Sequence, residues 1–168
     1  AKVIASKFGF SACFSTPPVR NGKTHQGGTS LLWRRDLGRC SMVDIKSDFP
    51  SSSVKMQWAD FAITSAYGPA DAVDRQWFQD VVAPSLSGRQ RHEFFIGDYN
   101  WRGAYDPLIP AGCSMCPAVV TTAANTFITK CVHTSGAVPD GLAEVYPVEG
   151  IHHHYATIYR FLPLPGLA

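Results

Sequence analysis

The sequence lacks any long apolar run and any strong excess of charge. No apolar stretch among its 168 residues is long enough to cross a bilayer, and no cationic segment followed by an apolar one stands near the start. We therefore expect neither membrane insertion nor a secretory leader. The formal net charge of +2 is too small to indicate a nucleic-acid partner, so such binding needs a local patch. The chain begins at Ala1 without a methionine, which suggests that a preceding segment was removed or was never captured.

The odd number of cysteines argues against a secreted disulfide framework. The five cysteines lie scattered at positions 13, 40, 113, 116 and 131, which favours an intracellular, reducing environment. A zinc site is one possible use for four residues: Cys113 and Cys116 form a C-x-x-C pair, and Cys131 and His133 follow it. The alternative is core packing, since cysteine often serves as a small buried apolar residue.

Length and composition indicate one domain over residues 1–168, and the alternation of strand, helix and strand in 57–96 is typical of an α/β unit. The hydrophobic content of 45% is enough for a sizeable core. Residues 71–86 carry the one strong helical period, and 1–8 have the pattern of a helix end before a glycine. Strand 39–46 is expected to form a hairpin with 27–34. Strands are expected at 10–14, 27–34, 39–46, 57–67, 93–96, 118–122, 142–146 and 155–161.

The most informative stretch is 93–101, Glu-Phe-Phe-Ile-Gly-Asp-Tyr-Asn-Trp. Its apolar residues predict a short buried strand, and Gly97 allows a sharp exit beyond it. Residues two apart on an extended segment point the same way, so Asp98 and Asn100 can face one pocket while Tyr99 packs behind them. This pair suits phosphate chemistry, because an acid can activate water or bind a divalent cation and an amide can bind a phosphate oxygen. The alternative is ordinary turn chemistry after a strand.

Three consecutive histidines, His152, His153 and His154, precede the expected last strand. Such a run can bind metal or be left from a tag, but this one is internal. Only alternate residues share a face of an extended segment, so the three cannot all point into one site.

Four motifs, taken together and in order, resemble the endonuclease/exonuclease/phosphatase superfamily. Within it, the loops are most similar to the apurinic-type endonuclease domains of non-LTR retrotransposons, which accompany a reverse transcriptase. The motifs cover nearly the whole chain. They are Gly27-Gly28-Thr29-Ser30-Leu31-Leu32-Trp33-Arg34, Ser65-Ala66-Tyr67-Gly68-Pro69, Ile96-Gly97-Asp98-Tyr99-Asn100, and a C-terminal Gly-x-x-x-His before a strand.

The resemblance implies a two-sheet β-sandwich flanked by helices, with a magnesium-dependent site that cleaves DNA phosphodiesters. By position, Tyr67 would contact the scissile phosphate, Asp98 would orient or activate the attacking water, and Asn100 would hold a phosphate oxygen. His154 would stabilise the developing charge, and Asp140 matches the additional acidic residue of the family. An intracellular, nuclear protein that acts on DNA is expected, and no protein partner can be inferred from the sequence.

The chain departs from the family pattern in two ways. The family's Ser-Asp-His motif is replaced by His152, His153 and His154, which leaves Asp98 and His153 as the candidate metal ligands. The family's first two strands, which carry an asparagine and the magnesium-binding glutamate, are expected before Ala1. We therefore expect a domain truncated at its N-terminus, impaired or inactive in cleavage, and poorly soluble because an apolar face or sheet edge is uncovered.

Two alternative functions remain open. The first is a non-catalytic remnant that binds nucleic acid through the arginines Arg34, Arg35, Arg89, Arg91 and Arg102. The second is a small zinc-binding module that uses Cys113, Cys116, Cys131 and His133. Stoichiometric zinc without magnesium-dependent cleavage would favour the zinc module.

Overall fold

The computed structural model describes residues 2–15, 19–20, 23–24, 28–43, 45, 52–69, 74–86, 91–100, 109–123 and 129–163. The helical elements are α1 (Lys2–Lys7), the 3-10 turn η1 (Arg35–Leu37), α2 (Asp74–Trp77), the π-helical turn η2 (Phe78–Val82) and α3 (Ala83–Ser85). The strands are β1 (Phe10–Phe14), β2 (Val19–Arg20), β3 (Lys23–Thr24), β4 (Ser30–Arg34), β5 (Ser41–Val43), β6 (Ser52–Gln57), β7 (Phe61–Tyr67), β8 (His92–Asp98), β9 (Cys113–Met115), β10 (Thr129–Thr134), β11 (Glu144–Val148) and β12 (Ile151–Ile158).

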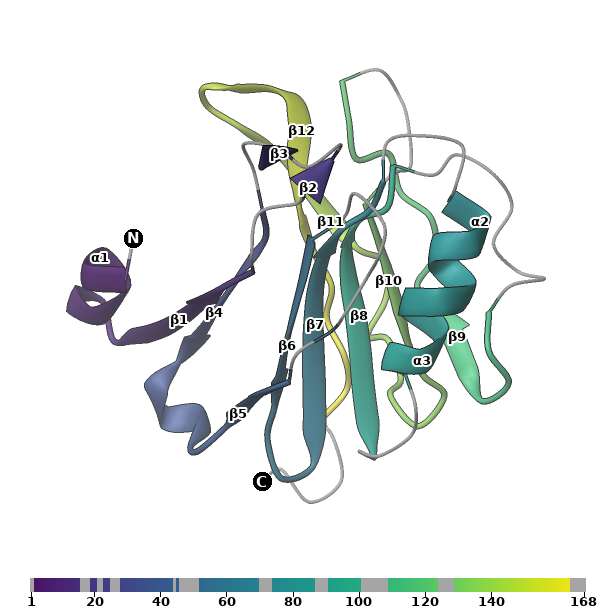
Figure 1. Cartoon of the computed structure of the whole chain (residues 1–168), viewed down its shortest axis with the longest axis horizontal. Helices are drawn as coiled ribbons and strands as arrows, with labels where there is room; N and C mark the ends of the chain where they lie inside the picture. Colours follow the sequence, from purple (N-terminus) through teal and green to yellow (C-terminus); the bar gives the residue numbers. More distant parts are fainter. Residues whose placement is uncertain are drawn as a thin grey trace.

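A six-stranded sheet forms the centre of the molecule, in the order β5-β6-β7-β8-β10-β9 (Figure 1). Strands β7 and β8 run parallel, and the other neighbouring pairs are antiparallel. The chain crosses from β7 to β8 through the helical segment α2-η2-α3, which packs on one face of the sheet (Figure 1). The carboxyl ends of β7 and β8 therefore lie side by side at one edge.

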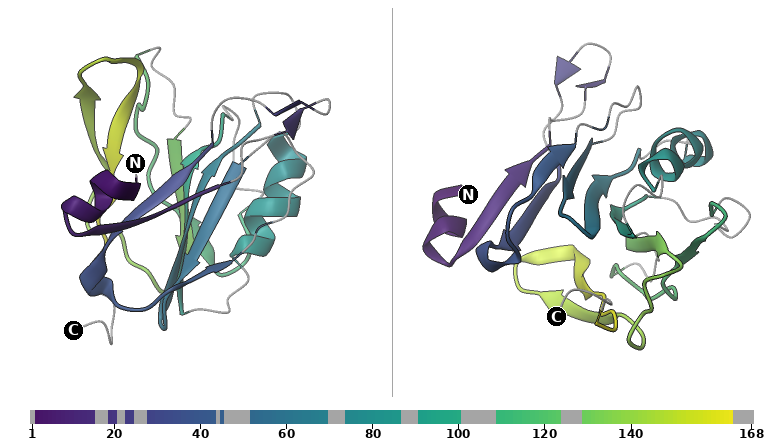
Figure 2. Two further views of the ribbon diagram at one scale, coloured as in Figure 1. Left: turned by 60° about the vertical axis from the view of Figure 1, so that its left-hand side comes forward. Right: turned by 90° about the horizontal axis from the view of Figure 1, so that it is seen from below.

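Two antiparallel ladders, β1–β4 and β11–β12, cover the other face of the central sheet (Figure 2). Cys13, Leu31 and Trp33 from the first ladder pack against buried residues of the central sheet, as do Tyr159 and Phe161 after β12. The predicted α/β sandwich of two β-layers with helices outside is confirmed.

Two apolar clusters hold these layers together. The helix-side cluster lies under α2, η2 and α3, and the interlayer cluster lies between the central sheet and the two ladders. Strand β8 contributes side chains to both clusters, because Phe95 faces the helices whereas Phe94 faces the ladders. The helix-side cluster contains Ala66, Trp77, Phe78, Val81, Val82, Leu86, Phe95, Tyr99 and Val132. The interlayer cluster contains Met56, Trp58, Phe61, Phe94, Cys116, Cys131 and Ala137.

The predicted helix is present over residues 74–85, and 70–73 lie outside the described residues. The described part of its expected apolar stripe is buried against the sheet, where the Trp77 ring lies edge-on to Tyr99 at 5.5 Å between centroids. The π turn η2 ends just before Pro84, which has no N–H to donate to the preceding turn. This proline explains the local widening of the helix.

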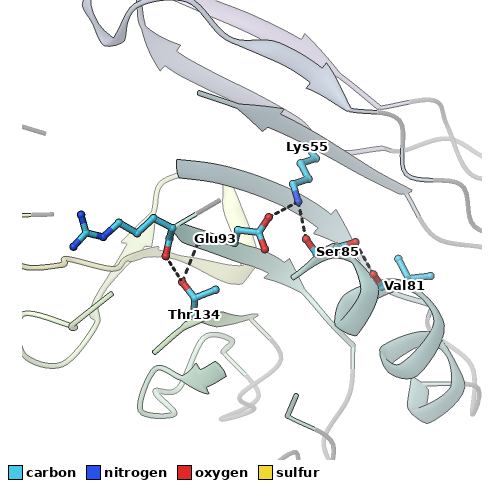
Figure 3. Close-up of polar contacts among 6 residues, drawn as sticks. Lys55, Val81, Ser85, Glu93 and Thr134 are labelled. Atoms are coloured by element: carbon cyan, nitrogen blue, oxygen red, sulfur yellow. Dashed lines mark hydrogen bonds and ion pairs between the residues drawn. The ribbon is translucent and has the colours of Figure 1, made fainter. Parts of the chain in front are cut away.

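A buried ion pair ties the helical segment to the sheet (Figure 3). The Lys55 Nζ on β6 donates to Glu93 Oε1 on β8 at 3.0 Å and to the Ser85 carbonyl of α3 at 2.7 Å. The Ser85 hydroxyl donates to the Val81 carbonyl, and the Glu93 N–H donates to Thr134 Oγ1 on β10 at 3.1 Å. Four elements are thus fixed around one buried charge pair.

Several predicted strands differ in the structure. The predicted strand 57–67 corresponds to β7 alone, because its first residue, Gln57, ends the preceding antiparallel strand β6 and the chain turns back where the Trp58 N–H donates to the Phe61 carbonyl. Strand β4 pairs with β1 rather than with the segment after it, since η1 and Gly38, at φ 82°, carry the chain to β5 at the edge of the other sheet. The predicted strand 118–122 forms only an isolated bridge at Thr122.

The outer face of the β1–β4 ladder is apolar and exposed. Phe8, Phe10, Phe14 and Leu32 have relative exposures between 37% and 74%. Poor solubility of the chain stays a prediction that this surface supports. No described helix is long and apolar enough to span a membrane.

Candidate active site

Tyr67 and Asp98 end the two parallel strands at the centre of the sheet. They are direct partners in the register of β7 and β8. Alternation places both on the face that looks toward the ladders, since Phe61 and Phe94 of the same strands belong to the interlayer cluster. Tyr67 is 40% exposed. A phenol and a carboxylate therefore stand side by side at an open edge between the layers.

Two glycines allow the strand ends to approach closely. A Cβ atom added at Gly97 would lie 1.9 Å from the Ala66 carbonyl oxygen, and one added at Gly68 would lie 2.7 Å from the Tyr99 carbonyl oxygen. The Gly68 N–H donates to the Asp98 carbonyl at 2.7 Å. The glycines of the two sequence motifs are thus required by the contact between these motifs.

Asn100 folds back onto Asp98 in a left-handed conformation, with φ 53°. Its N–H donates to Asp98 Oδ1 at 2.8 Å, and its side-chain amide donates to the Gly68 carbonyl at 2.9 Å. Asparagine tolerates this backbone region better than most residues. The turn beyond β8 thus orients the carboxylate and holds the amide beside it, while Tyr99 is buried behind them with its hydroxyl donating to the Phe95 carbonyl.

His154 comes from the second layer and completes the cluster. Its Nδ1 lies 3.7 Å from Asp98 Oδ2, and its side chain is 48% exposed against 16% for Asp98. The histidine lies where β12 departs from regular pairing with β11, and Thr122 forms a bridge with it from the other side. An imidazole from one layer thus faces a carboxylate from the other.

Burial raises the pKa of the Asp98 carboxyl above its ordinary value. The hydrogen bond from the Asn100 N–H and the charge of His154 oppose this shift without cancelling it. A carboxylate with a raised pKa accepts a proton more readily at neutral pH, which suits a general base.

Hydroxyl groups that sequence reasoning missed also gather at this edge. Thr129, the first residue of β10, lies directly across from Asp98 in the antiparallel register. The Thr29 and Ser65 hydroxyls hydrogen-bond to each other where β4 approaches β7. For Thr129 the available signal was the β-prone run Thr-Lys-Cys-Val-His-Thr, in which no strand was predicted.

Solved structures with the same architecture place this arrangement among known folds. D. rerio TDP2 in complex with a single-strand DNA product is 11% identical, with a TM-score of 0.64 over 96% of this chain and 80% of that one. The human Nocturnin catalytic domain with bound sulfate is 10% identical, with a TM-score of 0.64 over 96% and 75%. CdtB, the biologically active subunit of Cytolethal Distending Toxin, is 12% identical, with a TM-score of 0.60 over 87% and 64%.

The chain has the endonuclease/exonuclease/phosphatase fold. Neither a protein-family model nor a curated protein matches the sequence. The expected superfamily fold is thus supported by structural similarity, while the retrotransposon subtype stays a prediction.

Asp140 was predicted as part of the site, but the structure does not bring it there. Its N–H donates to the carbonyl of Arg160, six residues beyond His154, which corresponds to about 20 Å of extended chain. Strand β10 starts beside Asp98 and runs away from it, so a residue that follows β10 lies toward the other end of the sheet. Sequence order suggested Asp140, but strand direction excludes it.

The predicted metal sites do not form among the described residues. No three or more of their His, Cys, Asp and Glu side chains are placed to hold an ion. His153, predicted as a ligand with Asp98, is exposed, and its neighbour His154 takes the position beside the carboxylate. The four-ligand zinc site is wrong because Cys113 packs with the helix-side cluster, on the opposite face from Cys116.

The described arginines of the proposed binding patch lie away from the cluster. Arg34 ends β4 and pairs with Asp36, and Arg35 donates to Ser6 at 2.5 Å. Arg91 precedes β8, so it lies at the opposite end of that strand from Asp98. Arg89 and Arg102 lie outside the described residues.

Proposed function

We propose that this chain is a DNA-binding domain of the phosphodiesterase type that cleaves DNA poorly in its present form. The observation that carries the proposal is the meeting of Asp98, Asn100, His154 and Tyr67 at one open edge. A neighbour of the same fold bound to a single-strand DNA product supports DNA as the ligand. The order of the four sequence motifs supports an origin among retrotransposon endonuclease domains and hence a nuclear location.

The proposed roles follow from the donors and acceptors of each group. The half-exposed imidazole of His154 and the hydroxyl of Tyr67 can donate to phosphate oxygens. The second N–H of the Asn100 amide can do the same while the first keeps its bond to Gly68. Asp98, the one acceptor-only group of the four, can take the proton of an attacking water. The cluster therefore offers donors for a phosphate and a base for water.

Magnesium is implied by the superfamily resemblance, but the described residues fit it poorly. Mg²⁺ is usually held by one or two carboxylates together with waters and substrate phosphates. The cluster contains a single carboxylate, which already accepts the Asn100 N–H and faces an imidazole. Across from Asp98 stands the neutral Thr129. This donor set is the reason to propose binding with impaired cleavage, and no catalytic step is assigned to the metal.

Binding and cleavage are tested separately. Fluorescence anisotropy with labelled single- and double-stranded DNA should show binding by the chain, weakened about tenfold, or ~1.4 kcal/mol, by His154→Ala. Asp60→Ala, an exposed acid in the turn between β6 and β7, is the control that should leave binding unchanged. Equal affinities for the chain and its His154→Ala variant would contradict the proposed site.

Cleavage is followed as magnesium-dependent nicking of supercoiled plasmid. The unmodified chain should nick slowly at best, and His153→Asp, which places a carboxylate beside His154, should increase nicking. Rapid nicking by the unmodified chain that is lost with Asp98→Ala would overturn the claim of impairment. The same result would still support the assignment of the site to Asp98 and its neighbours.

A further inference from the structure

A second set of reactive side chains lies within the interlayer cluster, and its chemistry differs from that of the proposed phosphate site. Strand β9 pairs with β10 so that Met115 faces Val132, and the same register brings Cys116 opposite Cys131. The Cys116 N–H donates to the Cys131 carbonyl at 2.9 Å, which confirms that the pairing continues to this point. Both residues are buried in the same cluster.

The two thiols are close enough to bond without a change in strand pairing. Directly opposite residues on antiparallel strands have side chains on the same face, with Cα atoms about 5.5 Å apart in a hydrogen-bonded pair. Disulfides span Cα separations of roughly 4.4 to 6.8 Å. All five cysteines are free thiols in this structure.

His133 supplies a base beside them. It lies two residues beyond Cys131 on β10, so its side chain points to the same face, and it is only 2% exposed. Its Nδ1 lies 2.9 Å from the Thr134 carbonyl, which can only accept, so Nδ1 carries the proton. The neutral ring then has its lone pair on Nε2. This buried nitrogen has no hydrogen-bond partner among the described residues.

The pKa shifts of Cys116, His133 and Cys131 favour transfer of the Cys116 proton to His133. The neighbouring Cys131 thiol and His133 ring outweigh burial and lower the pKa of Cys116 to about 6. Burial would lower the pKa of His133, but the nearby Cys116 sulfur and the Thr134 carbonyl raise it instead. The neighbouring Cys116 raises the pKa of Cys131, which therefore stays a thiol. Burial raises the pKa of Cys40 and Cys113.

We propose that Cys116, His133 and Cys131 form a peroxide-sensitive thiol pair, in which Cys116 reacts first and Cys131 resolves it. The Cys116 thiolate attacks hydrogen peroxide, so that an S–O bond forms, the O–O bond breaks, and the leaving hydroxide takes a proton from the His133 imidazolium. The Cys131 sulfur then attacks the sulfenic acid, the S–O bond breaks, and the hydroxide leaves as water with the Cys131 proton. Two thiols are oxidised to one disulfide, and one peroxide is reduced to two waters.

This proposal does not depend on the proposed phosphodiesterase function. Peroxide is little larger than water, so the 6% of Cys116 that remains exposed is where it would enter. The product would join β9 covalently to β10, the strand whose first residue, Thr129, lies across from Asp98. The other cysteines serve as internal references, because the same sample reports on all five thiols.

The test uses the reduced full chain treated with hydrogen peroxide, quenched with an alkylating reagent at timed intervals, digested, and analysed by mass spectrometry. We expect a peptide cross-linked between Cys116 and Cys131 to form before Cys40 or Cys113 is oxidised. In Cys131→Ala, the Cys116 sulfenic acid should accumulate and be trapped by dimedone. His133→Gln should slow the reaction about tenfold, because less of the Cys116 thiol is ionised. Cys113→Ala should leave the rate unchanged.

Two results would overturn the proposal. One is oxidation of Cys40 or Cys113 as fast as Cys116 in the folded wild-type chain. The other is a Cys116–Cys131 cross-link that forms only in urea, which would show that the folded pair is shielded. Both comparisons use the wild-type chain, so the proposal is decided even if His133→Gln fails to fold.

Discussion

The buried pair of Lys55 and Glu93 allows a prediction whose size follows from the structure. The two charges lie 3.0 Å apart, with side-chain exposures of 8% and 1%. At an effective dielectric constant of about 20, their attraction over that distance is about 5.5 kcal/mol, which offsets the cost of removing both groups from water. Lys55→Met removes the attraction but leaves the Glu93 carboxylate buried beside an apolar side chain.

We therefore expect Lys55→Met to lower the free energy of unfolding by about 3–5 kcal/mol, a large fraction of the ~5–15 kcal/mol typical of a domain. The double variant Lys55→Met, Glu93→Leu should lose less than the single one, since no unpaired charge remains. Urea unfolding followed by the fluorescence of the buried Trp58 and Trp77 measures both. Lys7→Met, the same change at an exposed site, is the control.

A loss below about 1 kcal/mol for Lys55→Met would refute this reasoning, because it would show that water or another group compensates Glu93. If Lys55→Met does not fold, Glu93→Gln provides the milder measurement. That variant keeps the shape of the side chain and removes only its charge, so it should still be destabilising while the exposed Lys7→Met control is not.

Two further predictions concern the strand ends at the candidate active site. Since burial raises the Asp98 pKa, the carboxylate is less favourable in the folded state, and wild-type stability falls as pH rises from 3.8 through the raised value. Asp98→Asn should therefore be more stable than wild type at pH 7 and equal to it below pH 3.8 in urea titrations; a difference independent of pH would contradict this. Gly97→Ala should cost about 3 kcal/mol or more, because its Cβ would meet the Ala66 oxygen. Gly136→Ala, with no atom nearer than 3.6 Å to the added Cβ, should cost little, and equal losses for both would refute the steric argument.

The sequence predicted the candidate site better than it predicted the sheet. Tyr67, Asp98 and Asn100 each follow an apolar strand, and a local pattern of strand, glycine and polar residue is visible without knowledge of partners. The order of motifs also pointed to His154, which lies beside Asp98 in the structure. These residues meet because neighbouring parallel strands have their carboxyl ends at the same edge of the sheet. The helix predicted between β7 and β8 is enough to indicate that the two strands are parallel.

Strand partners and strand directions could not be predicted from such local patterns. The alternation of β4 is satisfied equally well by β5, which follows it in sequence, and by β1, which precedes it by a long connection. The choice depends on contacts with the central sheet, as when Leu31 and Trp33 pack into the interlayer cluster. Asp140 was misplaced for a related reason, since its position depends on the direction of β10, a strand that was not predicted.

The two carboxylates of β8, one buried and one partly buried, show why the polar cluster is better explained by a ligand than by the fold. Glu93 has a buried lysine at 3.0 Å, so its charge is balanced inside the protein. Asp98 has a half-exposed histidine at 3.7 Å, and burial raises its pKa, so its ionised form opposes folding. Among the described residues, Asn100 is the one non-glycine residue in a left-handed conformation, and it lies beside Asp98. The desolvated carboxylate of Asp98 and the strained backbone of Asn100 thus lie at the same strand end. A ligand that binds there and stabilises both groups would explain why they are present.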